Sequence, residues 1–253
     1  MLKCLAYCEG VMEATWLATV VCVPLYLNIW GESIQSQKNY LLRSLAIILA
    51  AAWIAKFFCQ IGLRSENAEA KRFRLKSLFT APLAIPVTIL ALAGLLSTLL
   101  SLSPWLSFWG VWFRRDGSYT TLSCLLFFAA LTTGIRSDQQ VNRLITAAIV
   151  ASFPISLYGV GQRFSIEPII TDASQLRVSS TFANPVFLGA YLIMVFPLTL
   201  GRVWSRWRAI RIEGKRGPRD LGQAIAYSLI ASAQLLAILF TASRGPFVGL
   251  VTA

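Results

Sequence analysis

The chain has 253 residues, of which 56% are hydrophobic and only 13% are charged, and its mean hydropathy is +0.64. This composition excludes a single soluble globular domain and indicates a membrane protein. The formal net charge of +12 raises the question of nucleic acid, but the basic residues lie in short segments between apolar stretches, where membrane topology is the commoner cause. We therefore expect no nucleic-acid partner.

Seven stretches are apolar enough to cross a bilayer as helices of about 20 residues. In chain order they cover 11–30, 41–61, 80–102, 119–135, 144–161, 182–201 and 222–241, and an eighth begins near Pro246. Alternating apolar and polar strands are absent from the sequence, and unpaired backbone groups are not tolerated in lipid. The sequence predicts an all-α, polytopic transmembrane helix bundle that forms one membrane domain over 1–253.

The loops between these stretches predict the orientation. With the N-terminus in the cytoplasm, about twice as many Lys and Arg residues fall inside as outside. The basic cytoplasmic loops are then 62–79 and 202–221, and the main external loops are 103–118 and 162–181. This predicts a multi-pass membrane protein whose N-terminus lies in the cytoplasm. Lys56 lies inside the second stretch, and we expect its ammonium group to reach the cytoplasmic surface.

The final stretch stops within a few residues of Pro246, which is too short to cross the bilayer. We expect the chain to be the N-terminal part of a longer protein. The alternative is a natural short form whose last segment lies at the outer surface.

The sequence predicts no metal site and no cofactor in this chain. It contains no histidine, no nucleotide-binding glycine motif, and external acidic residues that are not spaced like a metal cluster. The five cysteines form no CxxC pair, and we expect them to serve in packing: Cys4, Cys8, Cys22, Cys59 and Cys124.

Arginine is the residue that marks the external segments. The candidates are Arg114, Arg115, Arg163, Arg177 and Arg244. A guanidinium group is always charged and grips phosphate oxygens with two parallel donors. These residues are predicted to line a site for a phosphate-bearing ligand, and contact with lipid headgroups is the alternative for each of them.

Asn184 and Pro185 predict a helix start close to Arg177. Proline suits the first helical position, and asparagine caps the free amides before it. A helix N-terminus at this place would attract an anion. The alternative is an ordinary helix cap without a ligand.

Four short motifs follow one another at the predicted outer ends of the helices. They are FWGVWFRRDG with Gly110, Arg114 and Gly117, then YGVGQRF at 158–164, then Arg177 followed by STFANPVFLGAYL, and finally SRG at 243–245. Their order over about 80–253 resembles the O-antigen ligase and O-antigen polymerase family. The chain departs from the family at Ala183, where glycine is usual, and at Val186, where a second asparagine is frequent.

The resemblance implies a metal-independent, inverting glycosyltransferase reaction in lipopolysaccharide or other surface polysaccharide assembly. The donor would be a glycan on undecaprenyl diphosphate, at the outer face of the inner membrane, and the acceptor a glycan, a lipid or a protein. Arg177, Arg114 and Arg244 would bind the diphosphate, with help from Arg115 and Arg163. The residues expected to shape the site are Asn184, Pro185, Gln162, Gly117, Ser243 and Gly245.

The catalytic base stays unassigned. In the family, a histidine on a large external loop further along the chain is suggested for this role, and this chain has no histidine. The chain on its own is therefore not expected to catalyse the glycan transfer. Two alternatives remain: a secondary transporter or flippase, and a non-catalytic fragment. The charges lie at helix ends, which counts against a transporter, and the inward Gln234 is expected to form an interhelical hydrogen bond.

Overall fold

The computed structural model describes residues 2–28, 33–63, 83–166, 177–212, 214 and 217–252. Over these ranges the protein is helical and contains no strand, as the sequence predicts. The chain divides into two compact units. Unit 1 consists of Met1–Thr19 and Gly31–Val141, and unit 2 consists of Val20–Trp30 and Asn142–Ala253.

Five helical segments in the described part of the chain are long and apolar enough to cross a membrane. They are Lys3–Leu25, Ile34–Gln60, Asp138–Arg163, Pro185–Arg211 and Pro218–Phe240. Two further apolar helices are shorter, Ala84–Leu99 and Ser118–Gly134. The protein is therefore a multi-pass membrane protein. The predicted count of seven spans is not confirmed, because two of the predicted spans form helices of only 16 and 17 residues.

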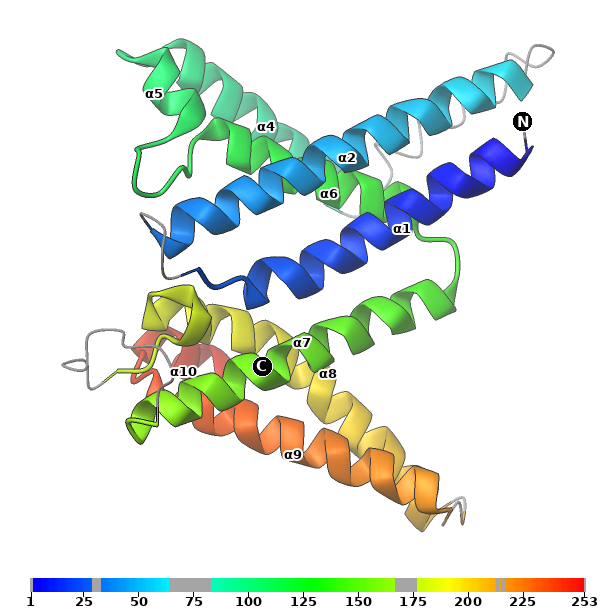
Figure 1. Cartoon of the computed structure of the whole chain (residues 1–253), viewed down its shortest axis with the longest axis vertical. Coiled ribbons are helices and arrows are strands. Elements are labelled where there is room, and N and C mark those ends of the chain that lie inside the picture. Colours follow the sequence, from blue (N-terminus) through cyan, green and yellow to red (C-terminus); the bar gives the residue numbers. More distant parts are fainter. Residues whose placement is uncertain are drawn as a thin grey trace. The chain divides into compact units, whose positions relative to one another are not determined.

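Unit 1 contains the helices α1 (Leu2–Leu25, to Thr19 in this unit), α2 (Ile34–Leu63), α4 (Ala84–Leu99), α5 (Pro104–Trp109) and α6 (Ser118–Gly134). Helices α1 and α2 lie side by side, with the start of α1 near the end of α2 (Figure 1). Helices α2, α4 and α5 each pack on α6. Trp16, Leu49 and Ala130 are among the buried residues of this unit.

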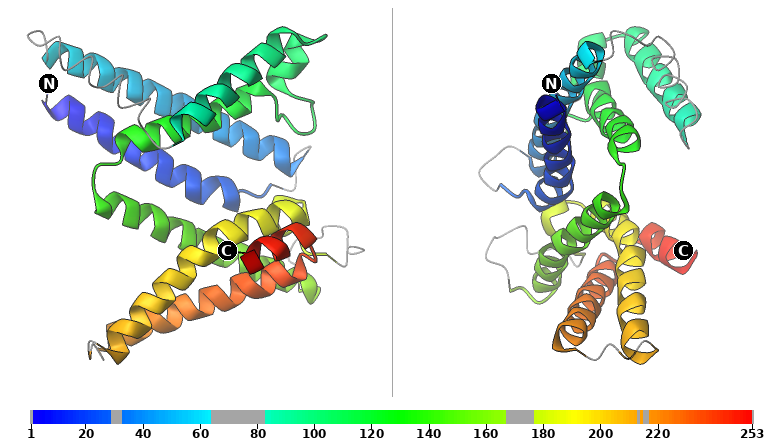
Figure 2. Two further views of the ribbon diagram at one scale, coloured as in Figure 1. Left: turned by 180° about the vertical axis from the view of Figure 1, so that it is seen from behind. Right: turned by 90° about the vertical axis from the view of Figure 1, so that its right-hand side faces the viewer.

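Unit 2 contains α7 (Asp138–Arg163, from Asn142 in this unit), the 3₁₀ turn η1 (Ser180–Phe182), α8 (Pro185–Arg211), α9 (Pro218–Phe240) and α10 (Arg244–Thr252). Helices α8 and α9 pack along each other, and the short α10 lies against α8 (Figure 2). Apolar residues from α7, α8 and α9 build the core: Ile155, Leu188, Leu192, Phe196, Ala237 and Ile238.

The inward-facing Gln234 of α9 is fully buried. Its amide Nε2 donates to the hydroxyl of Ser152 in α7 at 2.6 Å. The predicted interhelical hydrogen bond is thereby confirmed. In an apolar core this bond satisfies polar atoms that would otherwise be costly to bury.

Several helices extend beyond the predicted apolar stretches. Helix α1 begins at Leu2 rather than near residue 11, and α8 continues to Arg211, into the predicted loop 202–221. The short α5 lies in the predicted external loop 103–118. Hydropathy marks where side chains stop being apolar, whereas a helix continues for as long as its backbone hydrogen bonds do. Arginines such as Arg208 and Arg211 extend a helix past its apolar part, because arginine favours the helical backbone and its long side chain reaches water.

Candidate functional site

Arg177 is fixed between two backbone segments of unit 2. Its Nε donates to the carbonyl oxygen of Thr241 at 3.0 Å, and an Nη donates to the hydroxyl of Ser243 at 2.8 Å. Both partners are buried, whereas Arg177 itself is exposed. The guanidinium group therefore has a defined orientation and remains accessible.

The end of α7 is joined to the same region. The side-chain oxygen of Gln162 accepts a hydrogen bond from the backbone N–H of Ser180 at 2.6 Å. The Ser180 hydroxyl in turn donates to the Ile155 carbonyl at 2.7 Å, and the Val178 N–H donates to the Phe240 carbonyl at 3.1 Å. The three later motifs, 158–164, 177–192 and 243–245, thus converge within unit 2.

Asn184 and Pro185 start α8 as the sequence predicts. Asn184 is the N-cap, its side chain accepts from the Val186 N–H at 2.9 Å, and Pro185 is the first helical residue. The preceding Ala183 has φ +56° and ψ −2°, which is a left-handed conformation. Glycine adopts this conformation without steric cost. The departure at Ala183 therefore falls on a position where the backbone itself favours glycine.

Two further predicted arginines lie near the end of α9. The guanidinium carbon of Arg163 is 6.0 Å from the centre of the Phe240 ring, one residue before Thr241. Arg244 is the first residue of α10 and directly follows Ser243, and it is exposed, as is the adjacent Gly245. Segment 240–245 therefore carries or contacts all three predicted arginines of unit 2: Arg163, Arg177 and Arg244.

The first motif forms a closed loop in unit 1. Gly110, with φ +80°, and Gly117 bring the two ends of the loop together. A Cβ atom at Gly117 would lie 2.4 Å from the backbone N of Gly110 and from the carbonyl oxygen of Phe108. No side chain fits there, which explains the two glycines of FWGVWFRRDG.

The two arginines of this loop have different surroundings. Arg114 is exposed, and its Nε lies 3.7 Å from a carboxylate oxygen of Asp116. Such an exposed pair contributes little to stability. The guanidinium carbon of Arg115 lies 4.2 Å from the centre of the Trp112 ring, in a cation–π contact. Of the two, Arg114 is the more accessible to a ligand.

Arg43 of α2 organises the loop, a role that the sequence reasoning missed. It is 3% exposed, its Nε donates to the Thr120 hydroxyl at 2.9 Å, and one Nη donates to the carbonyl oxygens of Trp109 at 2.9 Å and Arg115 at 2.6 Å. Placing an arginine at the edge of the apolar stretch 41–61 costs free energy. An arginine retained there despite that cost indicates a specific partner, and this was the signal available in the sequence.

Three buried donors of this loop have no hydrogen-bond partner among the described residues. They are the other Nη of Arg43, Nε of Arg115 and Nε1 of Trp109. Buried donors in proteins are normally satisfied, so an unmet group calls for an explanation such as a bound anion or water. These three donors are enclosed by the protein and are not exposed to a ligand from outside.

The five predicted arginines are divided between the two units. Arg114 and Arg115 belong to unit 1, and Arg163, Arg177 and Arg244 belong to unit 2. A single site made from all five stays a prediction. The acidic residues Glu32, Glu167 and Asp172 lie outside the described residues.

Lys56 is ion-paired within unit 1. Its side chain is 3% exposed, and its Nζ lies 3.0 Å from a carboxylate oxygen of Glu9, which also pairs with Arg136 at 2.9 Å. The expected reach of Lys56 to the cytoplasmic surface stays a prediction, and the structure adds a carboxylate partner on the neighbouring helix. The adjacent pocket of about 20 Å³ has room for about one water molecule and is too small for a glycan donor.

Comparison with protein-family models, with curated proteins and with solved structures finds no match for this chain.

Proposed function

We propose that this protein binds a glycan carried on undecaprenyl diphosphate at the outer face of the bacterial inner membrane and acts as an O-antigen ligase or polymerase. Its N-terminus would then lie in the cytoplasm. The acceptor would be a glycan, a lipid or a protein, and the product would belong to a surface polysaccharide.

The observation that carries the proposal is the state of Arg177. This side chain is exposed, yet two hydrogen bonds to Thr241 and Ser243 fix its orientation. A guanidinium group that is already oriented loses little entropy when it binds an anion. The residues that hold Arg177 come from motifs that are far apart in the sequence, which supports the proposal that these motifs form one site.

The proposed chemistry needs positive charge at the leaving group. When an acceptor hydroxyl attacks the anomeric carbon, the bond from that carbon to the diphosphate oxygen breaks, and the diphosphate leaves with an additional negative charge. Arg177, assisted by Arg244 and Arg163, would stabilise that charge, an effect typically worth about 3 kcal/mol per well-placed donor.

Binding to undecaprenyl diphosphate tests the proposal directly. The purified chain in lipid nanodiscs is titrated with this lipid, and with undecaprenyl monophosphate and phosphatidylglycerol for comparison. The diphosphate should bind most tightly. Arg177→Lys should weaken its binding about tenfold or more, because lysine keeps the charge but loses the planar pair of donors.

Arg219→Lys is the matched control. Arg219 is an exposed arginine of unit 2, in the first turn of α9 and in the loop predicted to be cytoplasmic. This variant should bind undecaprenyl diphosphate as the native chain does. Equal binding of undecaprenyl diphosphate and phosphatidylglycerol would show only a contact with lipid headgroups and would refute the proposal. An unchanged affinity of Arg177→Lys for undecaprenyl diphosphate would also refute it.

A further inference from the structure

We propose that Cys4, Cys8 and Cys59 form a binding site for a soft, thiol-binding metal cation, for which monovalent copper is the best match. This inference is independent of the proposed glycan chemistry, since it concerns the other predicted side of the membrane and different helices.

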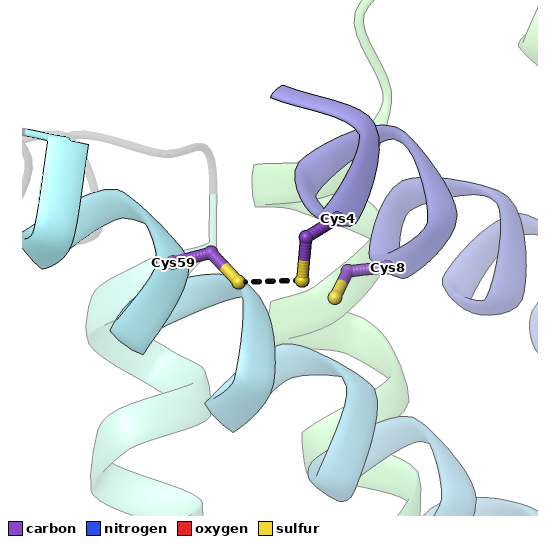
Figure 3. A group of neighbouring side chains, drawn as sticks. All are labelled: Cys4, Cys8 and Cys59. Carbon is purple, nitrogen blue, oxygen red and sulfur yellow. Dashed lines mark hydrogen bonds between the residues drawn. The ribbon is translucent and has the colours of Figure 1, made fainter. Parts of the chain in front are cut away.

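The three thiol groups converge from two helices of unit 1. Cys4 and Cys8 are four residues apart on α1, so they share one face of that helix, and Cys59 faces them from the last turns of α2 (Figure 3). The sulfur atoms of Cys4 and Cys59 are 2.9 Å apart. All three sulfur atoms lie within 4.8 Å of one another.

This spacing suits three sulfur ligands around one ion. With metal–sulfur bonds of about 2.3 Å, three ligands in a plane around the metal have sulfur atoms about 4 Å apart. The three sulfur atoms lie within 4.8 Å of one another and point toward a common centre, which is close to that requirement (Figure 3). The 2.9 Å between the sulfur atoms of Cys4 and Cys59 has to widen when the ion binds.

The ligand set favours a soft monovalent ion. Thiolate ligands select Cu(I), Zn(II) and iron–sulfur clusters. A structural Zn(II) ion takes four protein ligands, and among the described residues this group contains no fourth cysteine or carboxylate ligand. Cu(I) is satisfied by three thiolates. The three thiols release three protons as they bind one Cu(I), and the complex carries two negative charges without any change of oxidation state.

Positive charge lies close to this cluster. Lys56 is three residues before Cys59 on α2, and both Lys56 and Arg136 pair with Glu9, the residue that follows Cys8. Together with the Glu9 carboxylate, these two cations carry a net charge of +1, which offsets half of the −2 charge of a three-thiolate complex. The Lys56–Glu9 pair also joins α2 to α1 beside the cysteines.

The remaining cysteines serve as controls. Cys22 and Cys124 are exposed free thiols outside the group, and Cys4 is exposed while Cys8 and Cys59 are half-buried. Serine at any of these positions replaces a side chain that is not buried in the core. The variants are therefore expected to fold, and the thermal unfolding temperature of each in detergent checks this.

The experiment is a Cu(I) titration of the full chain in nanodiscs, kept reduced and without oxygen, in competition with a chromogenic Cu(I) chelator. The native chain and the double variant Cys22→Ser, Cys124→Ser should each bind one equivalent and develop thiolate-to-copper charge-transfer absorption in the near ultraviolet. Cys4→Ser, Cys8→Ser and Cys59→Ser should each lose at least about tenfold in affinity, the lower bound for removing even an outer-shell partner of a metal site.

Several results would overturn the proposal. One is a native chain that binds no Cu(I) beyond the level of the triple variant Cys4→Ser, Cys8→Ser, Cys59→Ser. Another is a folded Cys59→Ser variant with native affinity. The assignment to a monovalent ion also fails if equimolar Zn(II) displaces the bound copper.

Discussion

Arg43 in unit 1 and Arg177 in unit 2 make similar hydrogen bonds in different environments. Each donates from Nε and from one Nη to backbone carbonyl or hydroxyl oxygens of a segment distant in sequence. Arg43 is 3% exposed, whereas Arg177 is exposed. The same donor pattern therefore leaves Arg43 enclosed in a structural role, whereas Arg177 stays accessible for the ligand binding that we propose.

The segments that these residues hold also differ. The loop at Arg43 closes on itself through Gly110 and Gly117, so its shape depends on a contact between two stretches of backbone. The segment at Arg177 is anchored on the end of α9, and one of its residues, Ala183, has a positive φ without being glycine. Both segments contain a non-glycine residue at positive φ, Arg115 in the loop of unit 1 and Ala183 beside the candidate site, but only the loop of unit 1 is closed by a close contact between glycine backbones.

The largest effect should come from removing Arg43. Arg43→Ala leaves two carbonyl groups without their charged donor and should lower the free energy of unfolding by about 3 kcal/mol. Arg177→Ala removes an exposed side chain and should cost only about 1 kcal/mol, while it abolishes diphosphate binding. Chemical unfolding of both variants in detergent measures the two losses. Equal destabilisation by both would break the distinction between a buried structural arginine and an exposed binding arginine.

A smaller effect is expected from Gly117→Ala. The new methyl group would lie 2.4 Å from backbone atoms that cannot move independently, so we expect a loss of about 1–3 kcal/mol in the free energy of unfolding. Gly94→Ala in α4 is the matched control, because a Cβ atom there has nothing within 4 Å. That control should be neutral or up to about 1 kcal/mol more stable, since alanine favours helices. A tolerated Gly117→Ala would show that the loop does not depend on this contact.

The smallest expected effect is a gain in the free energy of unfolding rather than a loss. Glycine adopts a positive φ without steric cost, so Ala183→Gly should remove the strain at this position and stabilise the protein by about 1 kcal/mol. The measurement is a higher midpoint of chemical unfolding. Ala183→Val provides the counterpart, because a β-branched residue is poorly tolerated at positive φ and should destabilise. A destabilised Ala183→Gly variant would contradict the strain assigned to this position.

Much of the fold follows from composition and local pattern. The apolar stretches predict helices, and every one of the seven stretches contains a helix. The Asn184–Pro185 helix start and the hydrogen bond of Gln234 also follow from local rules, since a cap acts within one turn and a buried amide needs a partner. The predicted helix ends were less accurate, because the backbone hydrogen bonds of a helix continue past its last apolar residue.

The candidate site required more than local pattern. The sequence singles out Arg177 and Ser243 separately, but their contact joins residues that are 66 positions apart. Arg43 and the cysteines illustrate the same limit. The four-residue spacing of Cys4 and Cys8 is a local signal that places both on one helix face, yet nothing local brings Cys59 to them.

The sequence by itself determined that this is a helical, multi-pass membrane protein and which stretches contain its helices, because hydrophobicity acts over short distances along the chain. Only the tertiary structure decided the roles of individual charged and sulfur-bearing side chains. It paired Lys56 with Glu9, enclosed Arg43, left Arg177 exposed and gathered three thiols. These outcomes depend on burial and on partners from other helices, and neither is a property of a residue's own neighbours in sequence.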